Sequence, residues 1–297
     1  MFYLIPASEF TALVPIRMTP TSPLSPVVLI TGCSSGFGRQ LSLVALSRGF
    51  RVIATARRVE TLADLKEKGA EILPFDVTAP PSAISAFAAT AWGIHGQIDF
   101  LINNAGYLQG GAIEENTPEE IMAQFNTNVF GLLNTTNAFL PYFRKRRAGM
   151  IVNISSQGGC LNMIGAGPYC ASKAAVDSLS DTWAKELAEF NVKCISIQPG
   201  MFRTTVAASV QRGSHRIPEY TAPDKTIVEY NAAAGTELGD PTKAAERILG
   251  FITAESLDLP LRLPLGDDAY ESLKAFYLER LADMEKLRTW SVGTNFD

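Results

Sequence analysis

A tyrosine and a lysine four residues apart are the first candidates for chemistry in this sequence. The segment GPYCASKAAVDSL (167–179) is typical of a helix, so Tyr169 and Lys173 would lie one turn apart on the same face. A free phenol has a pKa near ~10, and a neighbouring ammonium favours its ionised form. Such a phenol could give and take a proton near neutral pH. The pair also arises by chance in helices, so other parts of the chain must support it.

A glycine-rich turn joins the first predicted strand to the first predicted helix. In VVLITGCSSGFGRQLSLVAL (27–46), Gly32, Gly36 and Gly38 separate an apolar run from an amphipathic one. Glycines allow a tight turn and a close approach to a pyrophosphate, and a helix N-terminus offers free N–H groups. The spacing is G-x-x-x-G-x-G, and it stands at the strand-to-helix junction that dinucleotide binding requires. The turn therefore predicts a dinucleotide site.

Two arginines at the end of the second predicted strand indicate which dinucleotide is bound. An NAD site usually carries an acidic residue there to bind the ribose hydroxyls. Here RVIATARRVE (51–60) ends in Arg57 and Arg58. A guanidinium binds a 2′-phosphate through two hydrogen bonds, whereas a carboxylate would repel it. We therefore predict NADP(H), with Arg57 as the contact.

Short apolar runs alternate with longer amphipathic segments from Val27 onward. The runs predict buried strands at 27–31, 51–55, 71–75, 100–104, 150–155, 193–198 and, more weakly, 261–265. Helical patterns occupy 38–48, 59–68, 81–92, 118–143, 168–190 and 269–287. This alternation favours an α/β fold, a single doubly wound Rossmann-type domain with a central parallel sheet of about seven strands. Residues 27–297 would form this NADP-binding catalytic domain.

Two stretches depart from this rhythm. Residues 1–26 are apolar in places but contain five prolines, which favours a loosely ordered extension over a signal peptide or a membrane span. Residues 200–236 contain several glycines and prolines and few periodic apolar residues. A long irregular segment inside a domain is typical of a lid or substrate loop, although an insertion without a role would look the same.

Composition excludes several classes of function. With 46% hydrophobic residues the chain can bury a full core, and its net charge of −4 gives no general attraction to nucleic acid or anionic lipid. The basic run 144–147 is most simply the C-terminus of a helix, with a contact patch as the alternative. Four separated cysteines and two histidines form no metal pattern, so we expect reduced thiols, no metal site and a cytoplasmic, soluble protein.

Seven short motifs appear together in a characteristic order. They are TGCSSGFG (31–38), FDV (75–77), NNAG (103–106), NTNVFG (126–131), NISS (153–156), YCASK (169–173) and PGMFRT (199–204). In order and spacing the chain resembles the short-chain dehydrogenase/reductase family from about Val27 to Thr204. The glycine turn and GDPTKAAERIL (239–249) look more like its 17β-hydroxysteroid and retinol dehydrogenase-like branch than like bacterial fatty-acid ketoreductases.

The resemblance implies a catalytic set. Ser156 stands 13 residues before Tyr169 at the end of a predicted strand and would orient the substrate oxygen. Tyr169 would exchange a proton with that oxygen, its pKa lowered by Lys173 and by the positive nicotinamide of the oxidised cofactor. Lys173 would also hold the nicotinamide ribose, and Asn128 would link it through a water to solvent. Ser155 should point to the other side of the strand and is the less favoured serine.

The resemblance also assigns cofactor contacts along the chain. Asp76 and Val77 would flank the adenine, and Thr204 would bind the nicotinamide carboxamide. The full set is Thr31, Gly32, Ser34, Ser35, Gly36, Phe37, Gly38, Arg57, Asp76, Val77, Asn103, Ala105, Gly106, Tyr169, Lys173, Pro199, Gly200, Phe202 and Thr204.

The predicted activity is NADP(H)-dependent hydride transfer to or from a hydrophobic secondary alcohol/ketone, with ketone reduction as the expected direction. Gln157, Cys160, Met163 and Ile164 are expected to frame a mostly apolar substrate pocket. The family resemblance implies a homodimer or homotetramer that pairs through helices 118–143 and 168–190. Two alternatives stay open, a non-redox isomerase or cyclase and an NADP(H)-sensing regulator. A Tyr169→Phe variant separates them from the oxidoreductase.

Overall fold

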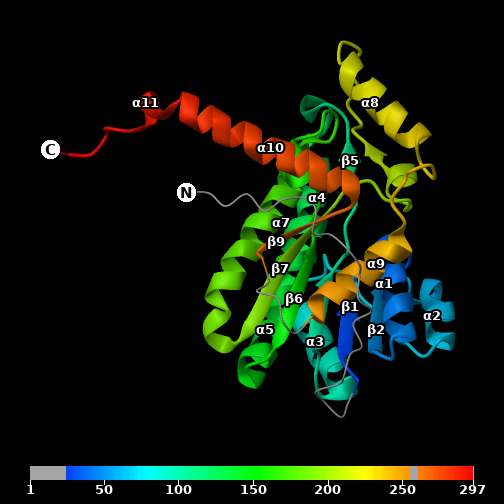
Figure 1. Ribbon diagram of the computed structural model, residues 1–297. Helices are drawn as coiled ribbons and strands as arrows, with labels where there is room; N and C mark the ends of the chain where they lie inside the picture. Colours follow the sequence, from blue (N-terminus) through cyan, green and yellow to red (C-terminus); the bar gives the residue numbers. More distant parts are fainter. Residues whose placement is uncertain (1–24, 255–259, 297) are drawn as a thin grey trace, which may run out of the picture.

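Seven parallel strands form the central sheet of the molecule (Figure 1). A computed structural model describes residues 25–254 and 260–296, so most of the predicted N-terminal extension lies outside the described residues. The strand order is β3-β2-β1-β4-β6-β7-β9. In chain order the strands are β1 (Val27–Ile30), β2 (Arg51–Ala56), β3 (Glu71–Pro74), β4 (Phe100–Asn103), β6 (Gly149–Ile154), β7 (Val192–Pro199) and β9 (Arg262–Leu265). The order reverses between β1 and β4, where sheets of this type bind ligands. The predicted fold is confirmed.

Helices cover both faces of this sheet. One face carries α1 (Gly36–Ser47), α2 (Ala63–Glu67) and α9 (Pro241–Ile252), and the other carries α3 (Pro81–His95), α5 (Leu132–Arg146) and α7 (Gly167–Glu186). The fully buried strand β1 shows why, because its side chains alternate between two hydrophobic cores. Val28 and Ile30 pack toward α1 and α9, and Val27 and Leu29 pack toward α3, α5 and α7.

A π-helical segment interrupts the long helix predicted at 118–143. The structure has α4 (Pro118–Phe125), the π-helical η3 (Asn126–Gly131) and then α5. The first of these begins at a capping box in which Thr117 Oγ1 accepts from Glu120 N and the Glu120 carboxylate accepts from Thr117 N. The basic residues Arg144, Lys145 and Arg146 form the last turn of α5, as predicted for a helix C-terminus.

The predicted loop 200–236 contains regular structure, which corrects the expectation of an irregular segment. The short strand β8 (Gln211–Arg212) pairs with β5 (Gln109–Gly110), and helix α8 (Thr221–Ala232) follows. Only Pro223 and Ile227 of α8 are buried, so the helix leaves almost no apolar periodicity in the sequence. The helix stands at one end of the molecule, near β5 (Figure 1).

Acidic side chains hold this segment in place. Glu115, on the short 3-10 helix η2 (Ile113–Glu115), is fully buried and accepts a hydrogen bond of 2.9 Å from Ile217 N. Arg216 lies 3.3 Å from the same carboxylate. Glu120 accepts from Ser214 N at 3.0 Å. The segment is therefore a wall anchored to η2 and to the first turn of α4.

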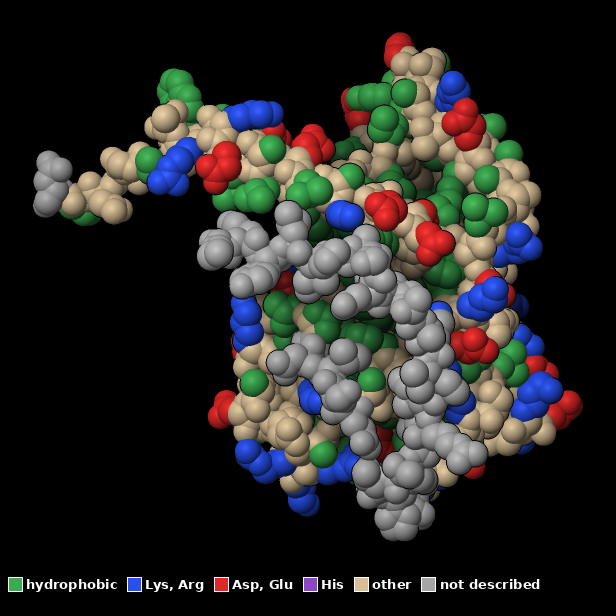
Figure 2. Space-filling view, in the orientation of Figure 1, with side chains coloured by type: hydrophobic (Ala, Val, Ile, Leu, Met, Phe, Trp, Pro, Cys, Tyr) green, Lys and Arg blue, Asp and Glu red, His purple; other side chains and the backbone are tan. Residues whose placement is uncertain are grey.

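The C-terminal helix α10 (Asp267–Lys286) starts against the sheet and then leaves the body of the molecule (Figures 1 and 2). Its only buried residues are Ala269 and Leu273, both near its beginning. A short helix, α11 (Arg288–Ser291), continues it. Within the described parts of the chain, no helix combines the length and apolar character needed to cross a bilayer.

Candidate active site

A cavity of about 630 Å³ opens where the strands end, a volume typical of cofactor and substrate sites. It extends from the turn after β1, past the ends of β2 and β4, to α7 and the residues after β7. The predicted site residues that line it are Gly32, Ser34, Ser35, Gly36, Phe37, Arg57, Asp76, Val77, Ala105, Gly106, Ser156, Gln157, Met163, Tyr169, Lys173, Pro199, Gly200, Phe202 and Thr204. Thr31, Gly38, Asn103, Asn128, Cys160 and Ile164 are not part of this lining.

The glycine turn has the shape of a cradle for a pyrophosphate. Gly32 and Gly36 adopt positive φ angles of 71° and 56°, which residues with a Cβ rarely adopt. A Cβ on Gly38 would collide with the backbone carbonyl of Gly32. The chain therefore turns tightly into α1, whose N-terminus faces the cavity with free N–H groups. These residues fit the predicted dinucleotide.

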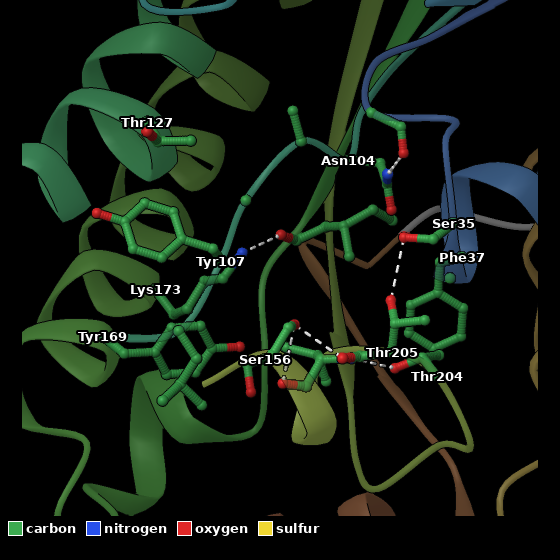
Figure 3. A pocket seen from close by; sticks show the side chains of 18 of the residues that line it. Ser35, Phe37, Asn104, Tyr107, Thr127, Ser156, Tyr169, Lys173, Thr204 and Thr205 are labelled. Carbon is green, nitrogen blue, oxygen red and sulfur yellow. Dashed lines mark hydrogen bonds between the residues drawn. The ribbon is translucent and has the colours of Figure 1, made fainter. Parts of the chain in front are cut away.

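Two side chains hold this turn in place, Thr31, which was predicted as a cofactor contact, and Asn104, which was not. Thr31 Oγ1 accepts hydrogen bonds of 3.0 Å from the backbone N–H groups of Asn104 and Ala105. Asn104 Nδ2 donates to the carbonyls of Thr31 at 2.8 Å and Gly32 at 3.0 Å (Figure 3). Thr31 thus supports the cofactor turn and does not line the cavity.

Asn103 does not reach the cavity, in contrast to the prediction. Its Nδ2 donates to Thr136 Oγ1 at 2.9 Å and to Asn153 Oδ1 at 2.8 Å, inside the core. The reason is strand geometry, since successive side chains at the end of β4 point to opposite faces. The neighbouring Asn104 faces the cavity instead.

Basic side chains surround a small hollow beside the cavity. Arg57 and Arg58 line it together with Ser34 and Thr61, and its volume is about 70 Å³. Both arginines are exposed at the end of β2. A hollow of this size, with two cations and two hydroxyls, fits a phosphate group. The cavity itself contains Arg57 but not Arg58.

Tyr169 and Ser156 face each other at the other end of the cavity (Figure 3). Tyr169 lies in the first turn of α7, and Ser156 lies just after β6, where its Oγ accepts from Gly158 N at 3.0 Å. Burial raises the pKa of Tyr169 above its ordinary value, and a hydrogen bond with Ser156 opposes this. The protein groups alone thus act opposite to the predicted lowering of the Tyr169 pKa.

Lys173 lies beside the tyrosine ring, one helical turn further along α7. Its Nζ is 5.8 Å from the centroid of the Tyr169 ring and donates to Ile154 O at 2.8 Å. Burial lowers the pKa of Lys173 to about 8, while the charge of Asp177 opposes this shift. At pH 7 the ammonium form therefore predominates in a buried position next to the phenol.

Ser155 and Asn128 take supporting positions. Ser155 Oγ donates to Lys173 O at 3.1 Å and so points toward α7, although Ser155 also belongs to the cavity lining. Asn128, in the π-helical η3, accepts from Tyr107 N at 3.1 Å and donates to Tyr107 O at 3.0 Å. It also donates to Ser172 Oγ at 3.1 Å, so it joins the Tyr107 wall of the cavity to α7.

The segment after β7 crosses to the glycine turn. Thr205 Oγ1 donates to Ser35 Oγ at 3.0 Å (Figure 3), and the rings of Phe202 and Phe37 meet edge to face at 5.2 Å. Gly200 is tightly enclosed, because a Cβ there would collide with the carboxylate of Asp268. The segment thereby covers the cavity at the position predicted for the nicotinamide.

Two predicted substrate residues are placed elsewhere. Cys160 is buried on the short helix α6 (Gly158–Leu161), and its thiol lies 3.4 Å from the Tyr277 hydroxyl of α10. Ile164 is 61% exposed in the turn before α7. The prediction assumed that the whole stretch after Ser156 faces the pocket, whereas the chain turns into a helix at Gly158. Of the four residues, Gln157 and Met163 line the cavity.

Several cavity residues were missed by the sequence prediction. Tyr107, Leu108, Val206 and Tyr230 line the same space, Tyr230 from helix α8. The motif NNAG carried a usable signal for Asn104, its second asparagine. Nothing in the sequence connects Tyr230 with a site formed mainly by residues 60 or more positions earlier.

Comparison with known proteins agrees with this geometry. The family described as short chain dehydrogenase matches residues 26–215. The chain belongs to the short-chain dehydrogenase/reductase family. An uncharacterized oxidoreductase of Bacillus subtilis, YusZ, is 35% identical over 252 residues, 81% of this chain and 89% of that protein. A short-chain dehydrogenase from Streptomyces avermitilis shares the fold with a TM-score of 0.83 and 38% identity, over 92% of this chain and 100% of the other.

A third member of the family was solved with a cofactor. A single-residue variant of actinorhodin polyketide ketoreductase, in a structure with NADPH, is 30% identical with a TM-score of 0.68. The match covers 80% of this chain and 94% of that short-chain dehydrogenase/reductase. As a member of this family, the chain is an oxidoreductase that binds a nicotinamide cofactor and a small-molecule substrate.

Proposed function

We propose that this short-chain dehydrogenase/reductase is an NADP(H)-dependent ketoreductase acting on a hydrophobic secondary alcohol/ketone pair. One observation carries the proposal. A single cavity contains a cradle for a pyrophosphate at one end and Ser156, Tyr169 and Lys173 together at the other. A dinucleotide held in that cradle extends toward the three side chains, which suit proton exchange with a carbonyl oxygen.

The cofactor would be held by residues from several elements. The glycine turn would bind the pyrophosphate, Asp76 and Val77 would lie at the adenine, and Thr204 at the carboxamide. Lys173 Nζ, already oriented by Ile154 O at 2.8 Å, would reach the nicotinamide ribose. When bound, the nicotinamide supplies a hydride to the carbonyl carbon or accepts one from the alcohol.

Ser156 and Tyr169 would act on the substrate oxygen. The Ser156 hydroxyl would donate a hydrogen bond to the carbonyl and hold it against the phenol. Burial raises the pKa of Tyr169, so the phenol carries its proton at pH 7 and can donate it as the alcohol forms. Lys173, in its ammonium form, would stabilise the phenolate that is left behind. A protonated Tyr169 supports reduction as the working direction.

The preference for NADP(H) is supported by the small basic hollow. Ser34, Arg57, Arg58 and Thr61 surround it, and a 2′-phosphate would bring a dianion to two guanidinium groups. The related actinorhodin ketoreductase was solved with NADPH, which agrees with this choice. We expect the wild-type KM for NADPH to be lower than that for NADH. Arg57→Ala and Arg58→Ala should each reduce the difference between these two KM values. A wild-type preference for NADH contradicts the assignment.

The substrate side of the cavity is largely apolar. Leu108, Met163, Val206 and the ring of Tyr230 pack in one hydrophobic cluster next to Tyr169. Such walls favour a hydrophobic ketone over a sugar or a charged metabolite. The anchored segment that carries α8 would form the substrate wall in place of a free lid.

Replacement of Tyr169 by phenylalanine tests the function. We expect wild-type protein to oxidise NADPH with hydrophobic ketones, and Tyr169→Phe to lose at least ~10²-fold in kcat while its Kd for NADPH stays unchanged. Retention of turnover in the variant refutes the catalytic assignment. A homodimer or homotetramer formed through α5 and α7 is also expected, and light scattering would measure its mass.

A further inference from the structure

An acidic side chain lies buried one helical turn beyond Lys173. Asp177 follows Lys173 by four residues on α7, and only 1% of its surface is exposed. It is not part of the cavity lining, and the proposed mechanism gives it no role. Burying a carboxylate is costly unless it is paired and hydrogen-bonded, so its surroundings need an explanation.

Strand β7 supplies two donors to this carboxylate. Ser196 Oγ donates to Oδ1 at 2.5 Å, and Gln198 Nε2 donates to Oδ2 at 2.8 Å. An amide N–H can only donate, so Oδ2 accepts, as it would in the ionised form. The Ser155 hydroxyl also lies close to this carboxylate, but it donates its single proton to Lys173 O.

The turn that carries Ser156 packs directly on Asp177. A Cβ on Gly159 would lie 2.9 Å from Asp177 Oδ2, so the glycine lets the turn approach the carboxylate. Gly159 N in turn donates to Ser156 O at 3.0 Å. Ser155, next to Ser156 in the chain, donates to the backbone carbonyl of Lys173. The Asp177 carboxylate thus lies against the turn that follows Ser156 and on the same helix as Lys173.

Charged and titratable side chains also approach Asp177 from β9 and α10. Arg262 of β9 lies 3.8 Å from Asp177 Oδ2, but it is held more closely by Asp181, at 2.6 Å. Tyr277 of α10 also lies close to Arg262. Burial raises the pKa of Asp177, while the hydrogen bonds from Ser196 and Gln198 and the Arg262 charge oppose the shift.

Of the titratable groups near Lys173, Asp177 is the one that supplies a negative charge. The ring of Tyr169 lies beside the ammonium, and Tyr230 of α8 lies near Tyr169. Burial raises the pKa of Tyr230 to about 12, so that phenol is neutral at pH 7. Burial lowers the pKa of Lys173, and Asp177 is the charge that opposes this.

We propose that Asp177 is a positioning residue whose buried negative charge keeps Lys173 in its ammonium form and whose hydrogen bonds from Ser196 and Gln198 hold α7 against β7. The consequence for turnover rests on the proposed function, but the state of Lys173 does not. Asp177 lies outside the cavity lining and would act through Lys173, which is part of that lining.

Titration of Lys173 by NMR tests the proposal without substrate or cofactor. The protein is labelled with lysine carrying ¹³C at the ε carbon, and the Lys173 signal is assigned from a Lys173→Arg variant. We expect a wild-type midpoint near 8, in line with the lowered pKa of this lysine. Asp177→Asn and Asp177→Ser should both lower the midpoint by roughly one unit, because each removes the opposite charge.

Asp181→Asn is the matched control. Asp181 lies on the same helix and shares Arg262, but it is one turn further from Lys173, so its removal should shift the midpoint by less than about a third of that amount. A merely structural role for Asp177 would lower thermal stability without moving the Lys173 midpoint. Thermal melts of all variants identify the folded ones.

Two outcomes overturn the proposal. One is a folded neutral variant whose Lys173 titrates as in wild type. The other is a wild-type protein in which Lys173 is already neutral at pH 7. This second outcome contradicts the proposal even if neither Asp177 variant folds. With a ketone substrate, the alkaline limb of kcat/KM should move down by the same amount in the variants. Absence of any turnover would count against the proposed function alone, since the titration does not depend on it.

Discussion

Two adjacent serines after β6 have different partners, and only one of them is a proposed catalytic residue. Ser156 faces Tyr169 in the cavity, and Ser155 donates to Lys173 O in the interior. Strand alternation predicts this division, because neighbouring side chains point to opposite faces. The same rule explains why Asn104 lines the cavity and Asn103 does not. In both pairs the sequence motif locates the candidate site residue to within one position. The direction in which each side chain leaves the strand then decides between the two neighbours.

Replacing each serine by alanine should separate the two roles. Ser156→Ala should lower kcat by about 10²-fold or more, because it removes a hydrogen bond to the reacting oxygen. It should also lower the free energy of unfolding by ~1 kcal/mol, because Gly158 N loses its acceptor. Ser155→Ala should lower the free energy of unfolding by ~1 kcal/mol and reduce kcat much less, since a buried hydrogen bond to the α7 backbone is lost. Steady-state kinetics and urea unfolding measure the two effects. Equal losses of kcat in both variants would contradict this division.

At the scale of elements, the sequence describes the strands better than the insertions between them. The apolar runs predict every strand of the central sheet, because the inner strands are buried on both faces and the edge strands β3 and β9 are still partly buried. Helix α8 escaped prediction because it buries only two residues and is held by polar contacts from distant positions. The π-helical turn at Asn128 was also missed, because α and π segments share one apolar pattern and differ in a single inserted residue.

Glu115 provides a test of the anchored wall. Its carboxylate accepts from the backbone N–H groups of Ala112 and Ile217, each at 2.9 Å, and Arg216 lies beside it. Glu115→Gln should lower the free energy of unfolding by ~1–2 kcal/mol at pH 7 and raise the KM for the ketone, with the Kd for NADPH unchanged. The neighbouring Glu114 is exposed and bonds only the Tyr220 hydroxyl among the described residues, so Glu114→Gln is the control.

The pH dependence of this effect has a definite sign. Hydrogen bonds from the Ile217 and Ala112 N–H groups and the Arg216 charge hold the pKa of Glu115 below its ordinary value, although burial opposes them. The stability that the carboxylate contributes is therefore present above the unfolded-state pKa and is lost as pH falls through the folded-state pKa. Unfolding curves of wild type and Glu115→Gln should converge below about pH 4. A difference that grows toward acid pH would be the opposite of this expectation.

At the scale of the whole molecule, the family motifs end at Thr204 but the site does not. Asp268, at the start of α10, accepts from Met201 N at 2.7 Å and encloses Gly200. Arg262 of β9 joins Asp181 and Asp177 on α7. These contacts connect residues 67 to 85 positions apart, and no local pattern announces them. The motifs therefore predict the proposed catalytic residues, whereas the contacts of the C-terminal segment with α7 and with the residues after β7 appear only in the three-dimensional structure.

The two halves of α10 should respond differently to change. Leu273, 1% exposed, packs where the helix meets the body, whereas the residues from Tyr277 onward are exposed or only half-buried. Leu273→Ala should lower the free energy of unfolding by ~2–3 kcal/mol and reduce kcat/KM, because it loosens the helix that carries Asp268. Deleting residues 285–297 should change that free energy by no more than ~0.5 kcal/mol and leave kcat/KM near the wild-type value. Chemical unfolding and steady-state kinetics of both variants compare these outcomes directly. Loss of activity or stability on deletion would show that the projecting half contributes to the catalytic unit after all.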